Sequence, residues 1–197
     1  MAKLNKRVWQ NINLTINTRL KVYQACVSSI ILHGSVTWTP YARQEAKLNS
    51  SHLRCLRRIL GITWQDRIPN TTVPEKAKYS SIHALLSQRR LRWMGHICRM
   101  EKGTMPKDLL YGELDRGRHK TGCPLLRFKD VCKRDMKSAA IEIESWELMV
   151  KDCSTWQHLV KEGIKHAEHT RNILILMYLL DAIIIMTLHI APNLRQL

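Results

Sequence analysis

The stretch QRRLRWMGHICRM, residues 88–100, holds a dense group of side chains that could do chemistry: four arginines around a tryptophan, a histidine and a cysteine. His96 and Cys98 are metal-ligating types, but two positions along a helix separate them by about 200° around its axis. They would therefore point away from each other and could not share an ion. The arginines remain as the feature to explain.

Signs of catalysis or of a bound metal are weak in the rest of the sequence. His52 and Cys55 supply two ligands, whereas a structural zinc site needs four. Hydrolase, metalloprotease and P-loop motifs are missing, and no two aspartates are adjacent. Asp130 and Asp135 are badly spaced for a metal pair, so we expect them to be solvated or paired with lysine. We expect no enzyme activity, metal, cofactor or small-molecule substrate.

The chain is strongly basic. Its 32 Lys and Arg against 16 Asp and Glu give a net charge of +16. The excess lies in residues 1–137, which carry 27 basic and 9 acidic side chains. Such a charge predicts an anionic partner, and we expect this partner to be a nucleic acid. The alternative is a basic face that is merely solvated.

On a helical wheel, residues 82–100 carry apolar side chains on two sides. Arg89 falls inside one apolar stripe, so its guanidinium must reach solvent, pair with a carboxylate or meet a phosphate. Arg92 and Arg99 share a narrow polar edge with Gly95 beside them. The pattern predicts a core helix that presents a basic edge to nucleic acid; the alternative is an edge that only water contacts.

A stronger candidate for phosphate binding is the loop DRGRHKTGCP, residues 115–124. Gly117 and Gly122 let a backbone approach closely, and basic side chains supply donors. A basic helix follows the loop, and Trp64 and Trp93 are available for stacking. The residues predicted to bind nucleic acid are Arg116, Arg118 and Lys120 in the loop, with Arg92, Arg99, Lys129, Lys133 and Arg134 extending the surface.

Three more arginines, Arg54, Arg57 and Arg58, stand at the end of a predicted helix over 41–60. Cations there complement the helix dipole. Contact with a phosphate is an equally good explanation, and the sequence leaves both open.

The spacing of apolar residues predicts a mainly α protein, a small helical bundle with basic loops and an apolar C-terminal helix. Long helices are expected over 18–33, 41–60, 81–100 and 125–141, with shorter ones after Thr72, at 105–114 and within 145–165. Gly34 and Gly61 suit two of the helix ends. We divide the chain into a helical segment 1–62, a basic extension 63–140, an acidic helical segment 141–170 and an apolar tail 171–197.

The six cysteines are widely spaced, without a CxxC pair and without an N-terminal signal peptide before them. This usage predicts reduced, mostly buried thiols in an intracellular protein, nuclear or cytoplasmic.

Residues 173–191 differ in kind from the rest. Eleven of these nineteen residues are Ile or Leu. As a helix, a segment of nineteen residues is long enough to span a membrane. Asp181 lies near the middle, where a carboxylate costs about 3 kcal/mol, so insertion is borderline. A tail-anchored membrane protein with a basic cytosolic domain is therefore an alternative, as is a buried helix.

Five ordered blocks resemble a known family: LKVYQACVSSIILHGSVTW, HLRCLRRILGITWQDRIPNT, QRRLRWMGHICRM, PKDLLYGEL and GCPLLRFKDVCKRDMK. Over residues 2–160 the chain is similar to the carboxyl-terminal part of reverse transcriptases encoded by LINE-type (non-LTR) retrotransposons. The resemblance implies a helical thumb and its downstream extension, which help to hold the RNA template and DNA primer. The remainder of a reverse transcriptase would then be a partner.

The chain also departs from that family. The catalytic Tyr-x-Asp-Asp motif and an endonuclease domain are absent from it. The basic loop reads Gly122-Cys123-Pro124 where the family usually has Gly-Arg-Pro, and the tail from about residue 171 has no counterpart. The resemblance therefore implies a non-catalytic fragment that binds the backbone of RNA or an RNA–DNA hybrid without sequence preference. The alternative is a degenerate reading frame with no function of its own.

Overall fold

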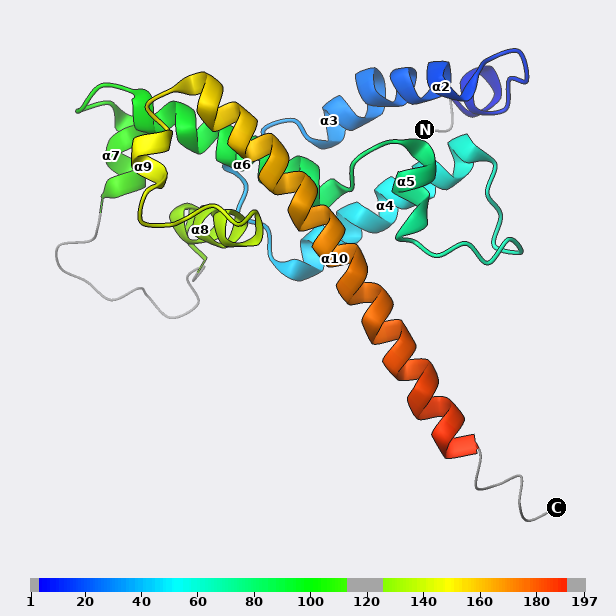
Figure 1. The fold of residues 1–197 in the computed structure, drawn as a ribbon. Coiled ribbons are helices and arrows are strands. Elements are labelled where there is room, and N and C mark those ends of the chain that lie inside the picture. The colour runs from blue at the N-terminus through cyan, green and yellow to red at the C-terminus, as the bar shows by residue number, and fades with distance from the viewer. Residues whose placement is uncertain (1–3, 113–125, 191–197) are drawn as a thin grey trace, which may run out of the picture.

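The computed structural model describes residues 4–112 and 126–190, and it is mainly helical (Figure 1). The described residues contain no strand, which confirms the predicted fold class. The elements in chain order are η1 (Asn5–Trp9), α2 (Ile16–Val22), η2 (Tyr23–Ser28), α3 (Ser29–Ile31), η3 (Ser35–Thr37), α4 (Ala42–Leu60), α5 (Thr72–Ala77), α6 (Ile82–Arg99), α7 (Met105–Tyr111), α8 (Phe128–Ser138), α9 (Trp146–Met149) and α10 (Cys153–Ile190).

Local signals explain where several of these helices begin and end. Ser81 caps α6, because its side chain accepts a hydrogen bond from the backbone N–H of Ala84. Gly61 ends α4 with φ at 70°, a left-handed conformation that glycine adopts without strain. Gly34, with φ at 66°, stands between α3 and η3 in the same way. The predicted ends at Gly34 and Gly61 are thus confirmed.

Helix α6 is the centre of the bundle and contacts η3, α4, α7, α8 and α10. Ile82 and Leu86 pack with Leu32 on one side, while Leu91 and Met94 belong to a larger cluster with α8 and α10. The apolar residues of α6 are therefore buried on two sides, as the wheel predicted.

The polar edge expected on α6 is partly covered by α10. Gly95 is buried, and a Cβ atom placed on it would lie 2.2 Å from Nε1 of Trp156. That indole is 1% exposed and donates a hydrogen bond of 3.0 Å to the carbonyl oxygen of Leu91. Gly95 is thus buried under α10, although Arg92 on the same helix is exposed, because the missing side chain makes room for the indole.

Helix α10 has two different halves. Its first half packs on α6 and α8, and its second half projects from the bundle, drawn from orange to red in Figure 1. The large apolar side chains of residues 173–180 are 39–74% exposed. Within residues 4–112 and 126–190, no helix combines the length and apolar character needed to cross a bilayer. The helix also runs without a break across position 170, and the proposed division of the chain into segments stays a prediction.

A smaller core joins α4, α5 and the N-terminal helices around an aromatic cluster. The hydroxyl of Tyr23 is hydrogen-bonded to Nδ1 of His52 at 2.7 Å, and both residues are fully buried. The ring of Tyr79 lies against both, and its hydroxyl donates to Oγ of Ser28. Burial lowers the pKa of His52 from 6.5 to about 4.

Gly95→Ala should destabilise the protein. Alanine is the better helix former by about 1 kcal/mol, but the new methyl group collides with Trp156, and overpacking of this kind costs about 1–3 kcal/mol. Urea denaturation should show a lower free energy of unfolding. The control is His96→Ala, at the exposed position next to Gly95, which should change the free energy of unfolding little. A Gly95→Ala variant more stable than the wild type would contradict this packing.

His52 should make stability fall in acid. Its imidazole is neutral in the folded protein down to about pH 4, whereas in the unfolded chain it binds a proton below about pH 6.5. The free energy of unfolding should therefore drop by about 3 kcal/mol as the pH falls from 6.5 to 4. His52→Gln should flatten this dependence in denaturation curves, whereas His33→Gln, at an exposed site, should leave it unchanged.

Candidate nucleic-acid interface

A buried ion pair between α6 and α8 sets the position of the basic side chains on α8. Arg90 is 1% exposed, and its Nε donates to Oδ2 of Asp135 at 2.7 Å. Its Nη2 donates to the other carboxylate oxygen at 3.2 Å, which makes the contact bidentate. The expectation that Asp135 is solvated or paired with lysine is wrong, because its position on the buried face of α8 brings it against Arg90.

Glu45 extends this pair to α4. Its Oε1 lies 3.6 Å from Nη1 of Arg90, and its Oε2 is hydrogen-bonded to Nδ1 of His83 at 3.1 Å. Burial raises the pKa of the Glu45 carboxyl, but the hydrogen bond from His83 and the charges of Arg90 and Arg134 outweigh it. The net result is a pKa below the ordinary value, so Glu45 is ionised at neutral pH.

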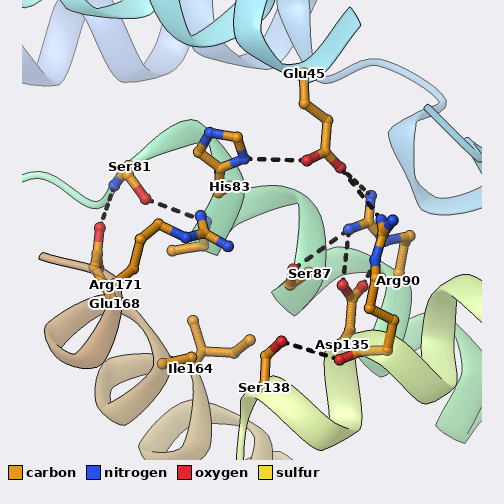
Figure 2. A pocket seen from close by; sticks show the side chains of 13 residues that line it. Glu45, Ser81, His83, Ser87, Arg90, Asp135, Ser138, Ile164, Glu168 and Arg171 are labelled. Atoms are coloured by element: carbon orange, nitrogen blue, oxygen red, sulfur yellow. Dashed lines mark hydrogen bonds and ion pairs between the residues drawn. The ribbon is translucent and has the colours of Figure 1, made fainter. Parts of the chain in front are cut away.

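These groups surround a polar pocket of about 310 Å³ between α4, α6, α8 and α10 (Figure 2). On the α10 side, Glu168 accepts a hydrogen bond of 2.6 Å from the backbone N–H of Ser81. The charged residues that line the pocket are balanced, with Arg90, Arg134 and Arg171 against Glu45, Asp135 and Glu168. The pocket therefore offers little net attraction to an anion, and its charges chiefly join four helices.

The predicted basic residues of α8 lie on two different flanks of the helix. Lys129 and Lys133 line a groove of about 520 Å³, whereas Arg134 lines the polar pocket. We call the first the α8 groove; it is lined chiefly by Trp93, Ile97, Leu109, Phe128, Lys129 and Lys133. Lys129 also lies over the ring of Tyr111, 5.1 Å from its centre, a cation–π contact.

The other predicted contacts are one exposed arginine and two arginines that contact other parts of the fold. Arg92 is exposed on α6. Arg99 is partly buried and donates to the carbonyl oxygen of Val150 at 2.9 Å. Arg134 is exposed, but its Nη2 is 4.0 Å from the carboxylate of Glu45. The structure thus brings Lys129 and Lys133 together and puts Arg134 elsewhere; Arg116, Arg118 and Lys120 lie outside the described residues.

Arg89 finds a partner that the sequence did not suggest. Its Nη1 donates to the carbonyl oxygen of Leu32 at 3.0 Å. Leu32 is the C-cap of α3, and its carbonyl oxygen also accepts a hydrogen bond of 3.1 Å from the backbone N–H of Ser35. A backbone carbonyl was not among the expected partners, which were solvent, a carboxylate and a phosphate; because Arg89 is only partly buried, contact with solvent stays a prediction.

A second basic surface lies along the end of α4. Arg54, Arg57 and Arg58 line a groove of about 660 Å³ with Asn49 and Asn70. Arg57 donates to the carbonyl oxygen of Ile68 and to Oδ1 of Asn70, and so holds the connector between α4 and α5. Arg54 and Arg58 are exposed, and no carboxylate is among the described residues that line this groove. Arg54 and Arg58 are therefore candidates for phosphate contact. The sequence left open whether these arginines contact a phosphate or only complement the helix dipole.

The described residues include five of the six cysteines. All five that the structure describes are free thiols. Burial raises the pKa of Cys55 and of Cys132. Cys26 and Cys153 are exposed, so the expectation of mostly buried thiols is wrong for these two. In the part of the chain that the structure describes, no three His, Cys, Asp or Glu side chains come close enough to hold a metal ion.

Comparisons with known proteins do not identify a relative whose function could be compared with these surfaces. No protein-family model matches the chain, and no curated protein or solved structure matches it significantly. The relation to reverse transcriptases stays a prediction that rests on the sequence blocks.

Asp135→Asn should strongly destabilise the protein, because it leaves the charge of Arg90 buried without its main partner. Breaking a buried pair in this way costs about 3–5 kcal/mol. The double variant Arg90→Met/Asp135→Leu should recover much of that loss, since apolar side chains of similar size need no partner. The free energy of unfolding measures both effects.

The control is Glu162→Gln, which breaks the exposed 2.8 Å pair with Lys165 and should leave the unfolding transition in place. A stable Asp135→Asn variant would show that the α6–α8 contact does not depend on this pair.

Proposed function

We propose that the chain is a non-catalytic fragment of a non-LTR retrotransposon reverse transcriptase, and that it binds RNA or an RNA–DNA hybrid through the phosphate backbone without sequence preference. The family origin is supported by the five ordered sequence blocks. No catalytic role is assigned, since the chain carries no Tyr-x-Asp-Asp sequence.

The observation that carries the binding proposal is the placement of Lys129 and Lys133 on one rim of the α8 groove. The two residues are four positions apart on α8, so they lie on one face of the helix, about 6 Å apart along its axis. Two ammonium groups arranged this way can contact one nucleic-acid backbone. Such contacts position a protein on its ligand and carry no sequence information.

The buried pair supports this proposal indirectly. Arg90 binds Asp135 on one flank of α8, and this contact fixes the rotation of the helix about its own axis. Lys129 and Lys133 are thereby held toward the α8 groove. The backbone positions of the two lysines are therefore set before a ligand arrives, which lowers the entropy cost of binding.

Lys129→Ala/Lys133→Ala should weaken binding to an RNA–DNA hybrid and make it less sensitive to salt. Each lysine that neutralises a phosphate contributes roughly 0.7–0.9 to the slope of log K against log salt concentration. The double variant should therefore lower that slope by about one to two. Fluorescence anisotropy with labelled nucleic acid over a series of salt concentrations measures it.

The matched control is Lys151→Ala/Lys161→Ala, which removes the same charge from two exposed positions that do not line the groove. If this control weakens binding as much, net charge alone drives the interaction and the groove is not the interface. Wild-type binding that does not change with salt would contradict the proposal as a whole.

A further inference from the structure

The α8 groove has an apolar floor, which contact with phosphates alone does not require. Trp93 and Ile97 of α6 and Phe128 of α8 line it. Met105 and Leu109 of α7 stand at its border with 76% and 75% of their surfaces exposed. Apolar side chains exposed in a hollow commonly mark a binding site.

The charges around this floor point to an anion. Among the described residues that line the groove, Arg127, Lys129 and Lys133 carry positive charge and Asp130 carries negative charge. A ligand suited to the groove therefore combines negative charge with a flat apolar face. An unpaired nucleotide has both, because its phosphate is anionic and its base exposes a ring face that a duplex would cover.

Trp93 is held in place for such a contact. It is partly buried and packs against the core cluster formed by α6, α8 and α10. The imidazole of His96 lies beside it, with ring centres 5.3 Å apart and planes inclined by 37°. A ring that is already fixed loses little freedom when a base stacks on it.

We infer that the α8 groove binds single-stranded nucleic acid, with an unpaired base against Trp93 and the adjoining phosphates at Lys129 and Lys133. This inference rests on the proposed nucleic-acid binding and narrows it to the unpaired strand. The groove volume, about 520 Å³, falls within the roughly 300–1,000 Å³ typical of sites for small ligands, and is thus sufficient for a nucleotide.

The test compares two single strands of equal charge: an oligothymidylate of roughly 12 nucleotides and an abasic oligonucleotide of the same length. The wild-type protein should bind the first about tenfold more tightly at low salt, because stacking of one base adds to the phosphate contacts. Equal affinity for the two would overturn the inference and leave backbone binding intact. Failure to bind either strand while the RNA–DNA hybrid is still bound would overturn the inference alone, whereas failure to bind all three would overturn both proposals.

Two variants locate the effect. Trp93→Leu should abolish the preference for the base-containing strand while leaving affinity for the abasic strand nearly unchanged. Because Trp93 also packs against the core, Leu109→Glu supplies a second test at a position that is 75% exposed. It should lower affinity for the oligothymidylate about tenfold. Ile30→Glu, equally exposed on α3 and outside the groove, is its matched control.

If Leu109→Glu and Ile30→Glu weaken binding equally, the groove is not where the strand binds. Thymidine monophosphate competing as well as the oligonucleotide would assign the groove to a free nucleotide and overturn the inference. An acidic peptide of the same charge that binds as tightly would overturn it as well.

Discussion

The ion pair between Arg90 and Asp135 is the contact on which the arrangement of the other helices depends. It joins α6 to α8 across 45 positions of sequence, and Glu45 brings α4 to the same guanidinium (Figure 2). Charges buried to this degree are costly unless they are paired and hydrogen-bonded. Few other rotations of α8 would satisfy both Arg90 and Asp135. The pair therefore favours one rotation of α8 over the others, although apolar side chains of similar size would also be compatible with this contact.

This contact also explains why the basic residues of α8 divide as they do. Asp135 faces the core, so Arg134 beside it turns toward the polar pocket, and Lys133 turns toward the α8 groove. Three consecutive charged residues are thus divided between two environments, with Arg134 and Asp135 at the polar pocket and Lys133 at the α8 groove. A count of basic residues along the helix treats them as one surface. The helical geometry instead separates Arg134, which lies among the balanced charges of the polar pocket, from Lys129 and Lys133, which line the α8 groove.

Features that depend on near neighbours in sequence were predictable. Helix α4 ends at Gly61 as expected because a left-handed residue after an apolar stripe is a local signal. The pairing of Arg90 with Asp135 depends on how two distant helices meet, so a single sequence does not contain it directly. One sign was present: Asp135 stands next to Met136 and four positions after Val131, inside the apolar face of α8. A carboxylate at such a position needs a buried cation as its partner.

The contact between Gly95 and Trp156 determines the register of α10 on α6. A shift of α10 by one helical turn, about 5.4 Å, would bring the indole opposite a residue with a side chain and break its hydrogen bond to Leu91. The point at which α10 leaves the bundle is therefore set by a glycine on another helix. The exposed apolar side chains of residues 173–180 are therefore held at a fixed distance from the bundle, because the same unbroken helix carries both Trp156 and these residues.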